Sequence, residues 1–178
     1  SYVYYHDSYR DSRDYFISKK YHIQKLEKAD AASFGSLGYG FGKDKSQAWL
    51  KEKSFTVADI AGLTAIDHQF AKDGIHAYFL GKEVKESNGK TFERIDSFYA
   101  KDSSNYYSIK SDQINFTIET INCNHPTFKI LEYPYSQDQD RVYYEGKIFK
   151  DAQARSFQII KYPYSKDEQY VYYENKII

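Results

Sequence analysis

Apolar and polar residues alternate along much of this chain, and short polar segments interrupt the alternation at intervals. Near the C-terminus, residues 160–164 alternate with the period of two that predicts a strand. The polar residues 165–169 predict a turn, in which an aspartate can accept hydrogen bonds from nearby backbone amides. A second strand is expected over 170–173, and a tight turn at 174–176 leads to a short third strand at 177–178.

Two other segments carry residues that tolerate helix. Residues 151–157 predict one helical turn, and residues 56–63 predict a short helix that ends at Gly62. A unit this small cannot bury its own apolar face, so we expect neighbouring units to stack and share a core.

The pattern repeats six times when an aspartate is taken as the origin of each unit. The origins are Asp11, Asp44, Asp73, Asp102, Asp138 and Asp167. Five residues later stands an aromatic residue, namely Phe16, Trp49, Tyr78, Tyr107, Tyr143 or Tyr172. Nine residues later five units have a lysine, with Ser111 as the exception: Lys20, Lys53, Lys82, Lys147 and Lys176. Six units with shared columns indicate a true internal repeat.

The spacing of the origins shows where the units differ in length. Successive aspartates are 33, 29, 29, 36 and 29 residues apart, and in two regular units a phenylalanine, Phe92 or Phe157, stands 19 residues after the aspartate. In the two long units this phenylalanine is delayed, so each insertion is expected between the lysine column and the closing phenylalanine. We place the first insertion within 25–33 and the second around 122–125.

These features predict a mainly β protein that forms a single repeat domain over residues 1–178. The expected architecture is an antiparallel meander of about six β-hairpin repeats of 29 residues with short helical turns. The array is expected to curl, to close into a barrel or propeller-like sheet, or to extend as a solenoid.

Composition changes this picture in one respect, because the chain is rich in aromatic residues. It has 20 Tyr, 12 Phe and 1 Trp among 178 residues, so tyrosine must supply part of the core. The formal net charge is zero, so no basic footprint for nucleic acid or anionic lipid is expected. The single cysteine, Cys123, cannot form an internal disulfide. No apolar stretch approaches the roughly 18 residues that a membrane-spanning helix needs.

The motifs resemble those of the DKNYY family of bacterial repeat proteins. The resemblance rests on Tyr-Ala/Ser-Lys-Asp followed by Val-Tyr-Tyr, Gly/Asn-Lys-Ile and Phe, best seen over 135–157 and 164–178 and next best over 70–92. It is strong over 66–178 and weak over 1–65. The sequence departs from the pattern at Gln137 and Tyr106-Tyr107-Ser108. The resemblance implies a secreted, surface or membrane-tethered protein without an assigned catalytic activity, and an association with toxin genes.

The recurring aspartates and lysines could form a repeated ligand or metal site, but positions shared by all units usually serve the geometry of the array. We therefore expect the aspartates to cap turns and the lysines to face solvent. The acidic residues Asp7, Asp11 and Asp14 could hold Ca²⁺, although their spacing is not that of a calcium loop. The glycine-rich segment 35–42 lacks the lysine of a phosphate-binding loop and is better read as a loop or strand.

Nucleophilic catalysis would require a positioned base. Cys123 and His125 stand two residues apart but have no orienting third group, and the five histidines lack zinc spacing. We expect no catalytic residue, no cofactor and no metal.

The remaining hypothesis is a binding surface. We expect a non-enzymatic protein-binding module, most specifically an immunity protein that occludes a bacterial toxin, with an envelope protein that binds glycan or peptidoglycan through exposed tyrosines as the alternative. The contact residues are expected to break the repeat, so the best candidates are Asn122, Cys123, Asn124 and His125. The expected location is the periplasm or a membrane tether, since a removed signal peptide or anchor would explain a chain without an initial Met, as would trimming.

Overall fold

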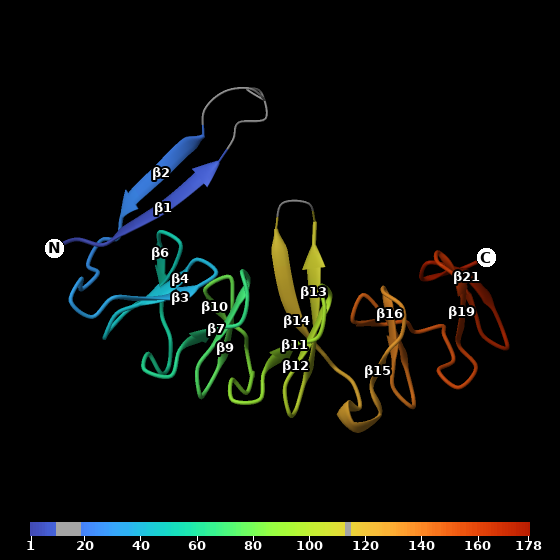
Figure 1. Cartoon of the computed structure of the whole chain (residues 1–178). Helices are drawn as coiled ribbons and strands as arrows, with labels where there is room; N and C mark the ends of the chain where they lie inside the picture. The colour runs from blue at the N-terminus through green and yellow to red at the C-terminus, as the bar shows by residue number, and fades with distance from the viewer. Residues whose placement is uncertain (10–18, 113–114) are drawn as a thin grey trace. The chain divides into compact units, whose positions relative to one another are not determined.

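The computed structural model describes residues 1–9, 19–112 and 115–178, which are almost entirely β-strands and turns (Figure 1). The chain divides into two compact units, Ser1–Lys90 and Thr91–Ile178. The mainly β class expected from the alternation is therefore confirmed.

Unit 1 contains, among its described residues, one long hairpin and two four-stranded sheets. The hairpin pairs β1 (Tyr4–Tyr9) with β2 (Lys20–Lys25). The strands of the two sheets are β3 (Gly35–Gly38), β4 (Phe41–Lys43), β5 (Ala48–Leu50), β6 (Lys53–Phe55), β7 (Thr64–Ala65), β8 (Phe70–Lys72), β9 (Ala77–Phe79) and β10 (Lys82–Glu83).

Unit 2 contains three four-stranded sheets in its described part. The first is β11 (Glu93–Arg94), β12 (Tyr99–Lys101), β13 (Tyr106–Ser111) and β14 (Phe116–Ile121). The second is β15 (Lys129–Ile130), β16 (Tyr135–Gln137), β17 (Val142–Tyr144) and β18 (Lys147–Ile148). The third is β19 (Gln158–Lys161), β20 (Tyr164–Lys166), β21 (Val171–Tyr173) and β22 (Lys176–Ile177).

Each of the five repeats from β3 to β22 is a four-stranded antiparallel meander, whereas the sequence predicts hairpin repeats. The segment 160–164, expected to be one strand, is the end of β19, a reversal and the start of β20, because Lys161 pairs with Tyr164. The two-residue turn at Tyr162-Pro163 preserves the alternation of side chains. The sequence pattern therefore does not reveal that the chain turns back.

The turn between β17 and β18 is the tight turn that its glycine, Gly146, predicts. Glu145 and Gly146 both have positive φ, at 50° and 74°, as the two-residue turn of a hairpin requires. Gly146 is needed here for a second reason, since a Cβ at this position would lie 2.5 Å from the Cβ of Ser108.

The two predicted helical segments are turns. In 56–63, the carboxylate of Asp59 accepts a hydrogen bond from the Gly62 amide, which closes a turn without continuing into a helix. In 151–157, a hydrogen bond from the Ser156 amide to the Gln153 carbonyl does the same. Within the described ranges, the one helix is a single 3-10 turn, His125–Thr127.

The first repeat has a different register from the one expected. The Leu26 amide donates to the Val3 carbonyl, as the Ile178 amide does to the Val171 carbonyl in the last sheet. Tyr4 therefore occupies the aromatic column, and β1–β2 corresponds to the third and fourth strands of a sheet. Asp11 and Phe16, which the sequence analysis assigned as origin and aromatic of this unit, lie outside the described residues.

The insertions also lie elsewhere. In the β11–β14 sheet, Ser108 pairs with Glu119. The equivalent residue of the next sheet, Tyr144, pairs with Lys147, which is only three residues away. The extra residues of the repeat that starts at Asp102 therefore lengthen the β13–β14 hairpin. Figure 1 shows this hairpin rising above the neighbouring sheet of unit 2. The placement of insertions at 122–125 and within 25–33 is wrong, because both segments form the regular linker that enters the next sheet.

The core lies between successive sheets of a unit. Tyr135, Val142 and Phe149 of the β15–β18 sheet pack on Phe157 and Tyr172 of the β19–β22 sheet, and all five are buried. The same arrangement joins β11–β14 to β15–β18 and, in unit 1, β3–β6 to β7–β10. We expected stacked repeats to share an aromatic core, and this is confirmed for successive sheets within unit 1 and within unit 2.

The model has no helix among its described residues that is long and apolar enough to cross a membrane. None of the described sheets closes on itself, so closure of the array stays a prediction.

Candidate binding surface

The recurring aspartates accept the hydrogen bonds that hold the turns and linkers of the fold; Asp44, Asp73, Asp102 and Asp138 are buried, and Asp167 is half-buried. We call the set Asp44, Asp73, Asp102, Asp138 and Asp167, with the groups bonded to them, the aspartate clasps. In the Asp138 clasp, one carboxylate oxygen accepts the amides of Asp140 and Arg141 at 2.9 and 2.8 Å and so closes the turn between β16 and β17. The other oxygen accepts the Asn124 amide at 2.8 Å and thereby holds the incoming linker against the sheet.

The aromatic column completes the clasp. The Tyr143 hydroxyl donates to Asp138 at 2.7 Å, and Tyr78, Tyr107 and Tyr172 donate to their own aspartates at 2.6 Å. Burial and the neighbouring carboxylate raise the pKa of the Tyr143 hydroxyl. Burial alone would raise the pKa of Asp138, but the hydrogen bonds from Asn124, Tyr143 and the turn amides outweigh it and hold that pKa below its usual value.

The clasp of the first complete sheet differs because its aromatic residue is Trp49, which has no hydroxyl. Asp44 accepts instead the Ser46 hydroxyl at 3.1 Å, in addition to the amides of Asp30, Ser46 and Gln47. The prediction that the aspartates cap turns is correct. Four lysines of the lysine column are exposed, as expected, and each begins the last strand of its sheet: Lys53 in β6, Lys82 in β10, Lys147 in β18 and Lys176 in β22.

Asn122, Cys123, Asn124 and His125, the predicted contact residues, lie in the linker between β14 and β15. The Asn124 amide is bound in the Asp138 clasp, and the Asn122 carbonyl accepts from the Tyr143 hydroxyl at 3.1 Å. The His125 ring packs on Tyr106, and its Nε2 lies 3.2 Å from the Asp102 carbonyl. These contacts give the segment a structural task, and a role in binding stays a prediction.

A nucleophilic role for Cys123 finds no support in its surroundings. The thiol is half-buried, and burial followed by the negative charge of Asp138 raises its pKa to about 11, which disfavours the reactive thiolate. Within the described ranges, no three His, Cys, Asp or Glu side chains gather as a metal site would require. Asp7 accepts from the Ser8 amide and the Tyr5 hydroxyl, while Asp11 and Asp14 lie outside the described residues. The glycine-rich segment 35–42 forms β3, a turn and part of β4.

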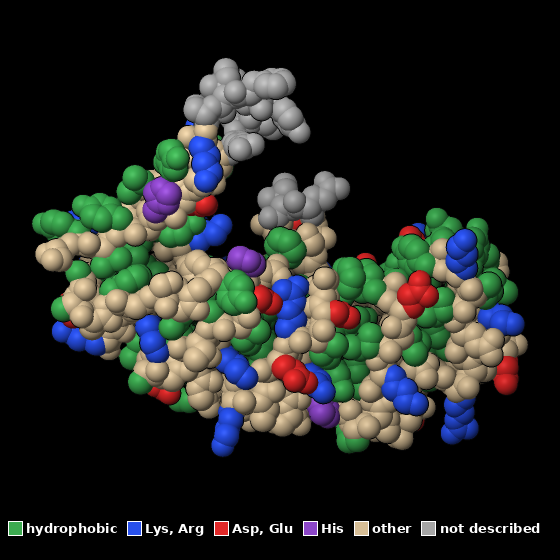
Figure 2. Space-filling view, viewed as in Figure 1, with side chains coloured by type: hydrophobic (Ala, Val, Ile, Leu, Met, Phe, Trp, Pro, Cys, Tyr) green, Lys and Arg blue, Asp and Glu red, His purple; other side chains and the backbone are tan. Residues whose placement is uncertain are grey.

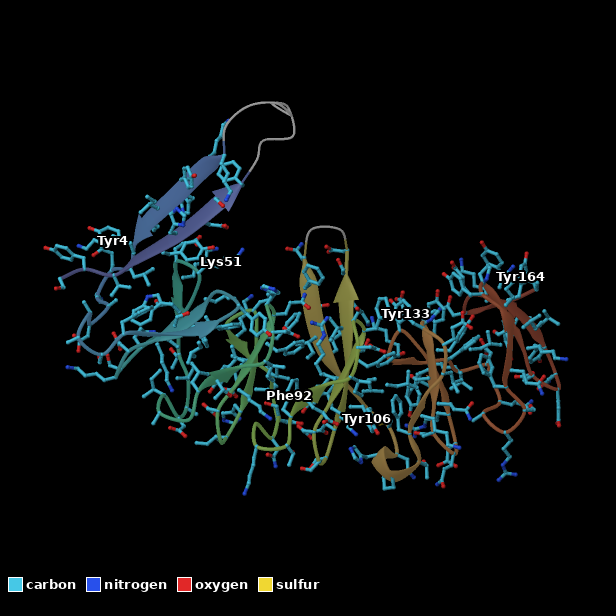
Figure 3. All side chains as sticks on the ribbon, in the orientation of Figure 1. Tyr4, Lys51, Phe92, Tyr106, Tyr133 and Tyr164 are labelled. Carbon is cyan, nitrogen blue, oxygen red and sulfur yellow. The ribbon has the colours of Figure 1, made fainter. Side chains whose placement is uncertain are left out.

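Aromatic side chains of unit 2 lie at the edge of its sheets where the first strand turns into the second; Phe98 and Tyr162 are exposed there, and Tyr133 is half-buried. We call Phe98, Tyr133, Glu145, Tyr162 and Glu174 the tyrosine rim. The rings of Phe98 and Tyr133 stack with their centroids 3.7 Å apart and their planes at 15°, which joins the first and second sheets of the unit. Figure 3 shows Tyr133 and Tyr164 on one side of unit 2 and Tyr106 toward the other side.

Each tyrosine of the rim is paired with a glutamate from the next turn of the same sheet. The Tyr133 hydroxyl lies 3.5 Å from the Glu145 carboxylate, and Tyr162 lies 3.4 Å from Glu174. The glutamate amides donate to the Pro134 and Pro163 carbonyls at 2.8 and 2.7 Å, so the two turns brace each other. Burial and the charge of Glu145 raise the pKa of the Tyr133 hydroxyl. Figure 2 shows hydrophobic side chains interspersed with carboxylates on this part of unit 2.

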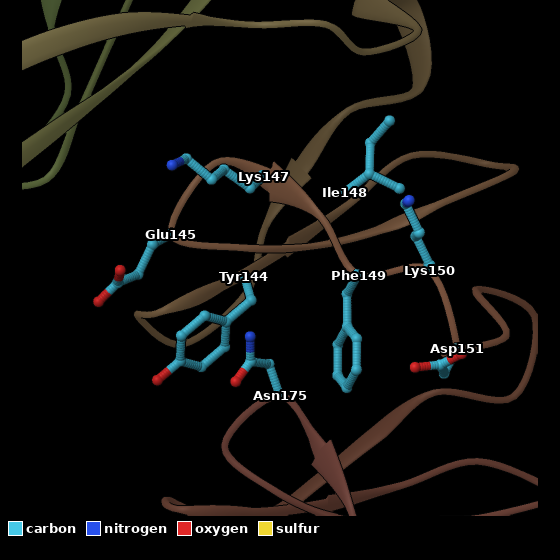
Figure 4. A pocket seen from close by; sticks show the side chains of 8 residues that line it. All are labelled: Tyr144, Glu145, Lys147, Ile148, Phe149, Lys150, Asp151 and Asn175. Carbon is cyan, nitrogen blue, oxygen red and sulfur yellow. The ribbon is translucent and has the colours of Figure 1, made fainter.

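A groove of about 320 Å³ borders the rim. It is lined by Tyr144, Glu145, Lys147, Ile148, Phe149, Lys150, Asp151 and Asn175. Figure 4 shows the rings of Tyr144 and Phe149 and the Asn175 amide on one side of β18, whereas Lys147 and Ile148 point away. The groove thus offers one aromatic wall and several hydrogen-bonding groups.

The sequence analysis did not identify the rim, although it expected exposed tyrosines. A signal was present, since Tyr133 and Glu145 recur 29 residues later as Tyr162 and Glu174. The pairing follows from two turns that meet at the same sheet edge, and those turns were hidden in the alternation of 160–164.

Comparison with known proteins identifies the class to which this architecture belongs. The DKNYY family matches residues 56–176, which is most of the chain and includes four of the five clasps. The chain belongs to the DKNYY family. No curated protein and no solved structure matches it.

Proposed function

We propose that this protein is a non-enzymatic binding module that recognises a protein partner through the tyrosine rim of unit 2. The observation that carries the proposal is the exposure of aromatic side chains there: Phe98 and Tyr162 are 38% and 45% exposed, whereas the clasp tyrosines Tyr107, Tyr143 and Tyr172 of the same unit are fully buried. Tyrosine provides a large contact area at low rotamer cost, and it is enriched among residues that dominate binding.

The chemistry of the rim favours a partner that presents lysine or arginine. Each tyrosine ring stands beside a carboxylate, so a cation can contact the ring face and the glutamate together. The rim glutamates are held in place by their backbone hydrogen bonds. A basic segment of a protein is therefore the expected ligand.

The biological role that we propose is that of an immunity protein, which neutralises a bacterial toxin by covering its active surface. The toxin as partner, and a periplasmic or membrane-tethered location, come from the resemblance to the family.

The test is binding of the purified chain to the products of neighbouring genes, followed by a toxicity assay in cells. Tyr162→Ala and Tyr133→Ala are each expected to weaken binding by about 30-fold or more, the size of a hot-spot loss of roughly 2 kcal/mol. The matched control is Tyr39→Ala in unit 1, an exposed tyrosine at the equivalent turn that packs on His68. Equal losses for the control and the rim variants, or no partner and no protection, would contradict the proposal.

Glycan binding is the second candidate, and the groove beside the rim favours it. An aromatic wall formed by Tyr144 together with Asn175 and Asp151 can stack on a sugar ring and bond its hydroxyls. Sedimentation with cell walls and a glycan array separate the two functions, since Tyr144→Ala and Asn175→Ala would then abolish retention of the chain on the polysaccharide.

A further inference from the structure

The strand β14 is a long sheet edge in the middle of the chain. It has six residues, whereas the last strands of the other four-stranded sheets, β6, β10, β18 and β22, have two or three. It stands at the end of the strand order β11–β12–β13–β14, and among the described residues it pairs with β13 alone. Its outer side therefore presents a row of backbone amides and carbonyls.

The hydrogen bonds of β13 show which residues of β14 present these groups. The Ile109 amide donates to the Phe98 carbonyl, so the backbone polar groups of Ile109 point toward β12. Because Ile109 stands directly opposite Ile118, the amide and carbonyl of Ile118 point away from β13. The same holds two residues to either side, at Phe116 and Thr120. In the part of the chain that the structure describes, no hydrogen bond involves the backbone groups on this edge.

The strand β14 also lacks the features with which sheets prevent pairing at an edge. Such features are proline, lysine and β-bulges. The register of β13–β14 is unbroken, and β14 contains neither proline nor lysine. Its single charge, that of Glu119, is compensated by the Lys110 ammonium at 3.0 Å. The other long edge strand in the described ranges, β2, has a lysine at each end, Lys20 and Lys25.

We propose that two copies of this chain pair their β14 strands antiparallel, about a two-fold axis at Ile118. The strand is complementary to itself in this register. Ile118 lies opposite Ile118 of the second copy and Phe116 opposite Thr120, so every outward amide and carbonyl obtains a partner. The side chains that meet are aromatic and β-branched, which favours cross-strand pairs. Thr117 lies opposite Glu119, so no like charges face each other, and this agreement favours a second copy over an unrelated strand.

This association goes beyond the proposed function, because it uses neither the rim nor the groove. A two-fold contact joins the same surface of both copies, so assembly should stop at a dimer. One pair of strands is expected to bury less surface than the roughly 1,200–2,000 Å² of a stable complex. The dimer should therefore form at about 10–100 µM.

The experiment is sedimentation equilibrium of the whole chain from about 1 to 300 µM, with Ile118→Pro as the test variant. This change removes the central outward amide but none of the hydrogen bonds to β13, because proline is tolerated where the amide of an edge strand faces solvent. It should weaken dimerisation at least tenfold. Ile23→Pro in β2 is the matched control, since Ile23 stands three residues before the buried Leu26 as Ile118 does before the buried Ile121, and it should dimerise as the unchanged chain does.

Changes at Thr117 test the register. Thr117→Lys places a lysine opposite Glu119 of the second copy, and the contact occurs twice in the dimer, so association should strengthen by about 2- to 30-fold. Thr117→Glu places like charges opposite each other and should weaken association by about the same factor.

Several outcomes would overturn the proposal. A chain that stays monomeric at about 300 µM excludes it, and a mass that increases beyond that of a dimer excludes the two-fold contact. Equal weakening by Ile118→Pro and Ile23→Pro, with the circular dichroism of the unchanged chain kept in both, would place the contact away from β14. So would a dimer that neither change at Thr117 affects. If a proline variant unfolds, Ile118→Lys and Ile23→Lys replace the pair, because a lysine on an exposed edge also opposes strand pairing.

Discussion

The hydroxyl group of Tyr143 offers a direct test of the clasp, because Tyr143→Phe removes one oxygen and leaves the ring in place. The ring packs against Phe128 with centroids 5.8 Å apart, and this contact should persist in the variant. The change therefore removes the hydrogen bond to Asp138 without opening a large cavity. Since the hydroxyl is also 3.1 Å from the Asn122 carbonyl, the linker loses one contact too.

The magnitude follows from the geometry. The 2.7 Å bond joins a buried hydroxyl to a buried carboxylate, and a hydrogen bond to a charged group contributes about 1.5–3 kcal/mol. Asp138 keeps three amide donors in the variant, so the cost should not reach that of an unpaired buried charge. We expect Tyr143→Phe to lower the free energy of unfolding by about 1.5–3 kcal/mol at pH 7.

The pH dependence sharpens this prediction. The hydrogen bonds lower the pKa of Asp138 in the folded state, so their stabilisation is present above the unfolded value of about 3.9 and is lost as the pH falls below it. The difference between Tyr143→Phe and the unchanged chain should therefore shrink on acidification from pH 7 to about pH 3.

Urea unfolding followed by circular dichroism at the two pH values measures both effects. Tyr39→Phe is the matched control, since this hydroxyl is on a residue that is 50% exposed. A double-mutant cycle with Asp138→Asn isolates the pair, and its coupling energy should account for most of the single-variant loss. A loss below 0.5 kcal/mol at pH 7, or a loss that is equal at pH 7 and pH 3, would refute the role assigned to the clasp.

Three further predictions concern the rest of the fold. The whole chain should lose stability steeply as the pH falls below about 4, because four clasp carboxyls have pKa values that hydrogen bonds lower in spite of burial, and acid titration followed by fluorescence measures this. Gly89→Ala should lower the free energy of unfolding of unit 1 by at least about 1–3 kcal/mol, because the new Cβ would meet the carbonyl oxygens of His76 and Asp73. The control is Gly35→Ala, which has open space around it and should change the free energy of unfolding by less than about 1 kcal/mol. Lys43→Met should speed amide exchange in the turn at residues 60–63 by about tenfold, because the Lys43 ammonium donates to three carbonyls there, and unchanged exchange would show that the lysine is dispensable.

The repeat itself could be recognised because it depends on local chemistry. An aspartate that accepts hydrogen bonds from the backbone amides two and three residues ahead closes a turn wherever it stands. Its position in each repeat can therefore be recognised from the sequence. The same holds for Gly146, which the positive φ of its turn demands. The clasp tyrosines were identified as a column, although the hydrogen bond that explains them was not.

The sequence analysis assigned the wrong register to the two long hairpins, β1–β2 and β13–β14, for a related reason. Counting from Asp11 placed Phe16 in the aromatic column, whereas the backbone pairing puts Tyr4 there. A hairpin can lengthen by any even number of residues without disturbing its alternation, so spacing alone does not locate the added residues.

By itself, the sequence determined the mainly β class, the recurrence of the motif and the role of aspartate in the turns, because these follow from the period of a strand and from contacts between near neighbours. Only the tertiary structure decided that the repeats from β3 to β22 have four strands each, that Asp138 also holds a linker 14 residues earlier, and which faces are covered. Those features depend on groups brought together by chain reversal, and a reversal that keeps the alternation leaves no mark in the pattern of polar and apolar residues.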